Sequence, residues 1–334
     1  MRVILLLIIF FSQELNAQSH EMKKPDTIFQ RSYSRPEYQN VDSIMRSYHE
    51  RITESVDLYK VVYFIRTNFR EDSMRLRAAF IWITDNIDYD VEAWLKDDPA
   101  AGNIDYVIKK RKAICGGYAN LLKYFCDKFS IESRIINGYA RTERKDIYMR
   151  QTSLRSNHSW NLVKVNGEWK LLDPTWSAGF VVEPEIFPPY YVKFFNEIYY
   201  FTAPEKFILN HYPLQPPMQM LPRAFQEKQY MKWPMFTSNY LSENITAIKP
   251  DSAYIRIKKG DSIHFRFKTN AEYDSMFAIG DVMEKLFFAG KQKRNGDWIE
   301  FSYPVRVPGL YNLYIGYYSR KWMYFLVAYK IEVN

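Results

Sequence analysis

Residues 158–173, HSWNLVKVNGEWKLLD, limit the fold of this chain more than any other stretch. Two runs of alternating apolar residues flank the pair Asn166-Gly167. Such a pair is the strongest short signal for a β-hairpin, because both central residues of a type I′ turn need a positive φ. A two-residue turn also fixes the register, and here it predicts that Leu162 pairs with Leu171. The segment is therefore expected to form two neighbouring antiparallel strands.

The same register predicts that two polar side chains meet. Continued outward, it sets Trp160 opposite Asp173, so His158 shares a face with Asp173 as its diagonal neighbour. Diagonal positions are about 7–8 Å apart at the backbone, and a carboxylate and an imidazole can close that distance. The alternative is that Asp173 only forms the turn before Pro174. We predict a His158–Asp173 pair.

A cysteine lies at the start of a predicted helix. In RKAICGGYANLLKYFC, residues 111–126, and just beyond, apolar residues recur at three- and four-residue steps, which predicts a helix with one buried face. At the helix start, the positive end of the dipole lowers the pKa of the Cys115 thiol, and the Cys115 N–H would point to an acyl oxyanion. Gly116 and Gly117 would let a substrate backbone approach closely. The alternative is that Cys115 is a small buried residue.

The chain has two cysteines and five histidines, so the search for a nucleophile and a base is short. Cys126 falls on the apolar face of the predicted helix, roughly 16 Å along its axis from Cys115, so both thiols are expected to be free. By elimination, His158 is the candidate base. The other histidines fall in an N-terminal arm, a charged helix, a proline-rich connector and the polar face of a strand: His20, His49, His211 and His264.

The first residues, MRVILLLIIFFSQELNAQ, have the pattern of a secretory signal peptide, residues 1–17. One arginine precedes a short apolar run, and the run is too short to span a bilayer. We expect export from a bacterial cytoplasm, to the periplasm or the exterior, with no membrane span. The net charge of +8 comes from dispersed lysines and arginines, and an exported chain seldom meets nucleic acid, so we expect no nucleic-acid partner.

Composition changes along the rest of the chain and predicts an α+β protein with an all-β second domain. Residues 18–40 are polar and form a predicted arm. Residues 41–180 show helical periodicity and then the strands of the hairpin region, and form the predicted catalytic domain. Residues 181–244 are rich in proline and aromatics and form a predicted connector. Residues 245–334 contain six or seven short alternating strands, typical of an immunoglobulin-like β-sandwich.

Three segments, taken in order, resemble the transglutaminase-like superfamily. They are RAAFIWITDNIDYD, ICGGYANLL and NHSWNLVKVNGEWKLLDPTW, within residues 72–180. The ordered patterns C-x-G-Y-A, H-x-W-N and D-P-T-W are specific in combination. The resemblance implies a papain-like fold of helices packed on an antiparallel sheet. It also implies that Cys115 is the nucleophile, His158 the base and Asp173 the residue that orients His158.

A later stretch, YYFTAPEKFILNHYPLQPPMQML, resembles the kyphoscoliosis peptidase and cytokinesis-protein branch of that superfamily. The resemblance implies an enzyme that attacks an amide carbonyl of a protein or peptide substrate through a cysteine thioester. Water would make it a peptidase or deamidase, and an amine would make it a cross-linking acyltransferase. Bacterial members of this build resemble peptidases more than cross-linkers, so hydrolysis is expected. The alternative is a catalytically silent binding or scaffold protein with the same fold.

Four residues are candidates for the substrate cleft: Gly116, Gly117, Trp82 and Trp160. Trp82 falls in the matching upstream helix, and Trp160 lies in the strand that begins at His158. Burial in the core is the alternative for both tryptophans. Nothing in the sequence resembles the acidic calcium loops of animal transglutaminases, so the resemblance does not imply calcium dependence. We expect no cofactor and no metal.

Overall fold

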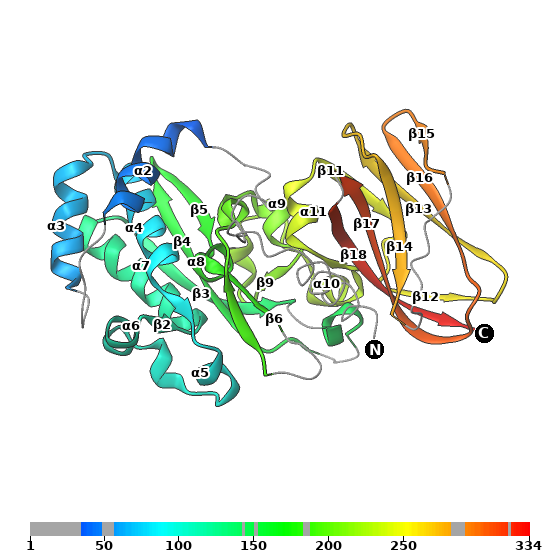
Figure 1. Ribbon diagram of the computed structural model, residues 1–334, viewed down its shortest axis with the longest axis horizontal. Coiled ribbons are helices and arrows are strands. Elements are labelled where there is room, and N and C mark those ends of the chain that lie inside the picture. The colour runs from blue at the N-terminus through cyan, green and yellow to red at the C-terminus, as the bar shows by residue number, and fades with distance from the viewer. Residues whose placement is uncertain are drawn as a thin grey trace, which may run out of the picture.

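The structure is a computed structural model, and Figure 1 shows it as a ribbon. It describes seven stretches of the chain: 35–48, 57–141, 144–149, 153–182, 188–281, 291–319 and 322–334. The predicted signal peptide, most of the predicted arm, His20 and His49 lie outside these residues. Within them, no helix combines the length and apolar character needed to cross a membrane.

Helices form one end of the molecule (Figure 1). They are α2 (Gln39–Ser47), α3 (Leu58–Asn68), α4 (Asp72–Asn86), α5 (Val91–Leu95), α6 (Ile104–Lys110) and α7 (Cys115–Phe129). Side-chain oxygens cap several helix starts: Asp57 accepts from a backbone N–H at the start of α3, and Asp90 and Asn103 do the same for α5 and α6. Helix α4 is apolar and buried around most of its circumference, so it forms the centre of this layer.

A five-stranded antiparallel sheet packs against α7. Its order is β8-β5-β4-β3-β9, and its strands are β3 (Ser133–Ala140), β4 (His158–Val165), β5 (Glu168–Leu172), β8 (Tyr200–Thr202) and β9 (His211–Pro213). The hairpin prediction is confirmed: Leu162 pairs with Leu171, and Asn166 and Gly167 have φ values of 53° and 81°.

The hairpin ends one residue earlier than its extrapolated register. The last pair is Asn161 with Leu172, so the expected pairing of Trp160 with Asp173 is wrong. Asp173 instead donates its N–H to the Tyr199 carbonyl and begins the short helix α8 (Pro174–Ala178). Proline at the first position of α8 favours this change from strand to helix, since its fixed φ suits a helix start.

Residues expected to form only a connector complete this sheet. Strands β8 and β9 come from the 181–244 segment, and they lie at the two edges of the sheet. The same segment contains β7 (Tyr190–Lys193), which forms a two-stranded sheet with β6 (Gly179–Val182). It also contains three short helices, α9 (Pro204–Phe207), α10 (Glu227–Lys232) and α11 (Ser238–Ser242). The domain boundaries stay a prediction.

Strands dominate the other end of the molecule (Figure 1). One sheet has the order β10-β18-β17-β14, with β12 beside β18, and the other has the order β11-β13-β16-β15. The strands are β10 (Met235–Phe236), β11 (Ile245–Lys249), β12 (Tyr254–Ile257), β13 (Ser262–Thr269), β14 (Ser275–Gly280), β15 (Lys293–Asn295), β16 (Trp298–Pro304), β17 (Gly309–Ser319) and β18 (Trp322–Val333). Their alternating apolar side chains share one core, as in a β-sandwich. The predicted fold class is confirmed.

That core reaches beyond the sandwich. Trp160, Leu162 and Leu171 of the five-stranded sheet belong to the same buried cluster as the inner residues of the sandwich sheets. The opposite face of the five-stranded sheet, through Val163 and Val165, packs with the helices. Alternation along β4 therefore divides its side chains between two cores.

A short parallel pair of strands, β1 (Asp88–Tyr89) and β2 (Lys112–Ala113), lies just before α7.

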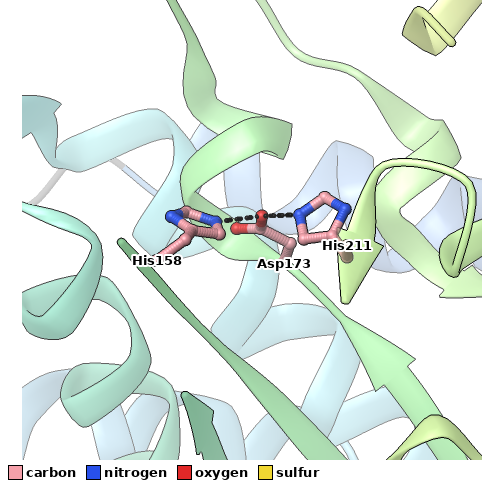
Figure 2. A group of neighbouring side chains, drawn as sticks. All are labelled: His158, Asp173 and His211. Atoms are coloured by element: carbon pink, nitrogen blue, oxygen red, sulfur yellow. Dashed lines mark hydrogen bonds and ion pairs between the residues drawn. The ribbon is translucent and has the colours of Figure 1, made fainter. Parts of the chain in front are cut away.

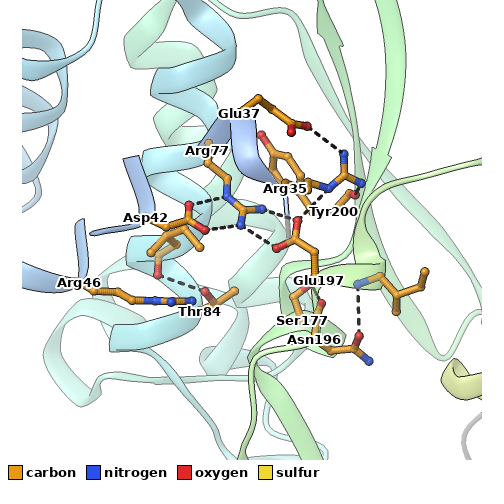
Figure 3. A network of polar contacts seen from close by, with 12 residues as sticks. Arg35, Glu37, Asp42, Arg46, Arg77, Thr84, Ser177, Asn196, Glu197 and Tyr200 are labelled. Carbon is orange, nitrogen blue, oxygen red and sulfur yellow. Dashed lines mark hydrogen bonds and ion pairs between the residues drawn. The ribbon is translucent and has the colours of Figure 1, made fainter. Parts of the chain in front are cut away.

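A buried arginine ties the helices to the edge of the sheet (Figure 3). The Arg77 guanidinium donates two hydrogen bonds to Asp42 on α2, of 2.7 and 2.6 Å, and two to Glu197, of 2.7 and 2.6 Å. It also lies over the Tyr200 ring, 4.6 Å from the centroid. The Arg77 side chain is 1% exposed, and two carboxylates with matched geometry compensate its desolvation.

Replacing this arginine should destabilise the fold strongly. In Arg77→Met, Asp42 loses its buried partner and Glu197 keeps only the partly exposed Arg35, 2.9 Å away, so we expect the free energy of unfolding to fall by about 3–5 kcal/mol. Urea unfolding followed by tryptophan fluorescence measures this. Lys96→Met is the matched control, because Lys96 pairs with Glu92 on an exposed helix surface and should leave the midpoint unchanged. Equal losses in both variants would contradict the assigned role.

Candidate active site

The candidate nucleophile occupies the first position of a long helix. Cys115 begins α7, directly after the short strand β2, and the residue as a whole is half-buried. Because it stands at the first position, its backbone N–H has no carbonyl four residues earlier within the helix. Cys126, on the same helix, is fully buried. Both thiols are free, which confirms the expectation from their spacing.

The candidate base is held by the strand next to this helix. His158 is the first residue of β4 and is 6% exposed. Asn161, further along β4, donates a 2.9 Å hydrogen bond from its amide to the Ala119 carbonyl of α7. Opposite His158 lies Gly138 on β3, where any side chain would collide with the Trp160 ring. The helix and the strand are therefore locked in one relative position.

Asp173 is completely buried and accepts four hydrogen bonds. Its Oδ1 accepts the backbone N–H groups of Thr175 (2.8 Å) and Trp176 (3.1 Å), which caps α8. Its Oδ2 lies 2.7 Å from His158 Nε2 and 3.0 Å from His211 Nε2 (Figure 2). The predicted contact between His158 and Asp173 is present, and Asp173 also has the capping role that was its alternative. Because Asp173 binds Nε2 of His158, Nδ1 is the nitrogen left for the Cys115 thiol.

His211 is the residue that sequence reasoning missed. It was assigned to the connector, but it begins β9, is fully buried, and reaches Asp173 from the side opposite His158 (Figure 2). Its ring packs against Phe207 and Trp176, with centroids 4.2 and 4.3 Å away. The one available signal was local: the flanking sequence FILNHYPL is too apolar for an exposed loop.

The electrostatics of the site favour a charged pair. Burial raises the pKa of the Cys115 thiol, but the hydrogen bond and charge of His158, with the Ser159 backbone, lower it below the ordinary 9.0. Burial lowers the pKa of His158, but Asp173 and the Cys115 contact raise it, to about 10. Both shifts favour a thiolate beside an imidazolium at neutral pH. For Cys126 burial dominates and raises the pKa to about 12, so its thiol stays protonated.

Asp173 carries the compensating negative charge. Burial raises the pKa of its carboxyl, but the charge and hydrogen bond of His158 and the hydrogen bond of His211 lower it below the ordinary value. Asp173 is therefore ionised at neutral pH.

Three of the four predicted cleft residues are buried and have a role in packing. Trp82 and Trp160 are 1% and 0% exposed, so the prediction that they line a substrate cleft is wrong. Trp82 packs edge-on against Phe125, and Trp160 lies between the sheet and the β-sandwich. Gly117 is buried against the segment before α7, where it leaves no space for a substrate backbone. Gly116 is partly exposed beside Cys115 and stays a candidate.

The group of His158, Asp173 and His211 offers three metal-ligating atoms within 4.8 Å of one another. Two ligands of one tetrahedral zinc ion would lie roughly 3.3 Å apart. The 2.7 and 3.0 Å separations from Asp173 Oδ2 are shorter, and both are ordinary hydrogen-bond lengths. The geometry therefore fits a hydrogen-bonded group better than a metal centre.

Comparison with known proteins agrees with this geometry. Residues 62–174 match the model of the transglutaminase-like superfamily. The chain carries a transglutaminase-like domain. The matched residues include Cys115, His158 and Asp173, whereas His211 lies beyond them.

Individual relatives match beyond the transglutaminase-like domain. Kyphoscoliosis peptidase of Mus musculus is 28% identical over 221 residues, which cover 63% of this chain and 31% of the relative. Cytokinesis protein 3 of Schizosaccharomyces pombe is 21% identical over 218 residues, 63% of this chain and 24% of the relative. The predicted branch is thus confirmed, and the chain spans about a third or less of the length of these relatives. A crystal structure of a TGase is 11% identical, with a TM-score of 0.28, covering 50% of this chain and 38% of that chain.

The two glycines after Cys115 should respond differently to alanine. A Cβ at Gly117 would lie 2.5 Å from the Ala101 carbonyl oxygen and 2.8 Å from the Ala113 Cβ. We expect Gly117→Ala to lower the free energy of unfolding by about 1–3 kcal/mol. A Cβ at Gly116 has its nearest neighbour 3.9 Å away, so Gly116→Ala should leave stability unchanged or raise it slightly. Urea unfolding of both variants checks this, and an equal loss in both would contradict it.

Proposed function

We propose that this chain is a cysteine enzyme that acts on amide bonds of proteins or peptides through a thioester on Cys115. One observation carries the proposal: Cys115 begins a helix beside His158, and buried Asp173 holds the far side of the His158 ring. The transglutaminase-like domain, which contains all three residues, supports it. In this proposal Cys115 is the nucleophile, His158 the acid and base, and Asp173 the residue that orients His158.

In the first half of the proposed reaction, the Cys115 thiolate attacks the amide carbon and forms a carbon–sulfur bond. The carbonyl oxygen gains the negative charge. The Cys115 backbone N–H, at the positive end of α7, would donate to that oxygen. His158 then gives its proton to the amide nitrogen as the carbon–nitrogen bond breaks, and ammonia or an amine leaves.

In the second half, water attacks the thioester while neutral His158 accepts its proton. The carbon–sulfur bond breaks, a carboxylic acid is released, and the Cys115 thiolate and the His158 imidazolium form again. An amine in place of water would give a cross-link. We propose hydrolysis as the main outcome, and the names of the mouse and human relatives, both kyphoscoliosis peptidases, support it.

We also propose that the protein acts outside the cytoplasm. The support is the signal-peptide pattern of residues 1–17, with a charged start, an apolar run and a Leu15-x-Ala17 end. The proposed protein or peptide substrate would then be met in the periplasm or the exterior.

The proposed ion pair predicts selective modification of Cys115. Iodoacetamide reacts with thiolates, so at pH 6–7 it should modify Cys115 quickly and leave buried Cys126 unmodified. In His158→Ala, burial is no longer opposed by the imidazolium, so the pKa of Cys115 rises and fast modification should require a pH above 9. Peptide mapping by mass spectrometry at several pH values measures both rates.

Cys126 is the internal control for unfolding, and Cys115→Ala assigns the modified peptide. Equal and slow modification of the wild type and His158→Ala would overturn the nucleophile assignment. It would leave the alternative, a binding or scaffold protein that keeps the fold without the chemistry.

The choice between water and an amine can be tested directly. We expect incubation with casein and a fluorescent primary amine to yield new peptide ends or released ammonia, with little amine attached to the casein. Cys115→Ala is the control for background reaction. Attachment of amine at a rate equal to or above hydrolysis would show that the chain is an acyltransferase instead.

A further inference from the structure

His211 is a buried titratable group that the proposed mechanism does not use. It shares one oxygen of Asp173 with His158, since both Nε2 atoms lie within hydrogen-bond distance of Oδ2. On its other side, His211 Nδ1 lies 2.6 Å from Asn210 Oδ1. Asn210 Nδ2, on the same amide, lies 3.1 Å from the Tyr199 hydroxyl oxygen. The side chains of Tyr199, Asn210 and His211 thus form a buried hydrogen-bond chain that ends at Asp173.

Hydrogen-bond chemistry determines which atoms donate in this chain. Asp173 is an ionised carboxylate and only accepts, so His211 Nε2 carries a proton. In the recorded orientation of the Asn210 amide its oxygen faces Nδ1, so His211 would donate from both nitrogens and be a cation. Burial opposes that state and lowers the pKa of His211 to about 4, although Asp173 raises it. The titratable groups that face His211 are Asp173, His158 and Tyr199.

A neutral His211 has one consistent arrangement. The oxygen and the NH₂ group of the Asn210 amide exchange places when the amide is turned by 180°. Nδ1 of His211 then accepts from the NH₂ group. The amide oxygen then accepts from the Tyr199 hydroxyl. Every donor in this hydrogen-bond chain points toward Asp173. Oδ2 therefore accepts one hydrogen bond from an uncharged imidazole, that of His211.

We infer that His211 is a positioning residue that acts on His158 through Asp173: as a neutral imidazole it shares Oδ2 and limits how tightly the carboxylate holds the His158 proton. This inference rests on the proposed function for its consequence. Without His211, Asp173 Oδ2 would bind His158 alone and would concentrate its charge on that one imidazolium. A second donor on the same oxygen spreads the charge, and His158 then releases its proton more readily to the leaving amine.

The test measures proton binding by His158 without any reaction. In the Cys115→Ala protein no thiol titrates with His158, and NMR of ¹³C,¹⁵N-labelled histidine follows each ring through a pH titration. We expect His211→Phe to lower the acid dissociation constant of His158 roughly fivefold, the contribution of one hydrogen bond. His211→Gln keeps a donor that can reach Asp173 and should restore most of the wild-type value.

His264→Phe is the matched control, because His264 lies exposed on β13 with Ser302 as its partner and should leave His158 unchanged. Combined with Asp173→Asn, His211→Phe should have no further effect on His158. A His158 titration that stays unchanged, or that moves the other way, in folded His211→Phe would overturn the inference, even if the melting temperature falls.

Should His211→Phe fail to fold, the unsubstituted protein decides the question. We expect the ¹⁵N shifts of His211 to show a neutral ring protonated at Nε2 from pH 5 to 9. A cationic ring, or a proton on Nδ1, would overturn the inference. Failure of the proposed function is a separate result, because it appears as slow modification of Cys115 in the wild type, whatever the His158 titration shows.

Discussion

The carboxylate of Asp173 is the interaction on which the rest of the site depends. It has no contact with solvent, so each of its oxygens must find donors within the protein. The donors come from three places: the first turn of α8, the start of β4 and the start of β9. Chain segments nearly 40 residues apart therefore converge on one charge. Any change that moves one of them also moves the ring of His158.

Arg77 is a second buried charge, of opposite sign, and it too finds its hydrogen-bond partners within the protein. Its guanidinium is buried among aromatic rings and is neutralised by carboxylates from α2 and from the residues before β8. Asp173 and Arg77 lie at different parts of the same sheet-and-helix layer, and each binds segments that are distant in the sequence. Satisfied buried ions specify one arrangement of these segments, because a shifted arrangement would leave a charge without partners.

Local signals predicted the parts of this site that lie close together in the sequence. Asn166-Gly167 fixed the β4–β5 register, and the apolar spacing after Cys115 placed that residue at a helix start. His211 was missed because its place beside Asp173 depends on the pairing of β9 with β3, which contains Gly138 and Ala140 some 70 residues earlier. Periodicity within a segment carries no information about such a pairing.

Burial of the tryptophans was missed for a related reason. Trp160 alternates correctly for a strand, but the face it occupies is covered by the β-sandwich, whose first strand, β10, begins about 75 residues later. Trp82 lies on a helix that is buried on nearly all sides, so a polar and an apolar face cannot be told apart from its sequence. A cleft residue and a core residue have the same local pattern in both places.

The two cysteines of α7 show which part of the environment controls the chemistry. Burial is the largest influence on both thiols, and it raises the pKa of both. Only Cys115 has an imidazolium beside it, and only its pKa falls below the ordinary value. A position at the start of a helix favours a thiolate, but the opposing effect of burial shows that the histidine is required as well. The charge state of Cys115 therefore depends on His158, which depends on Asp173 and on the groups that bind its second oxygen.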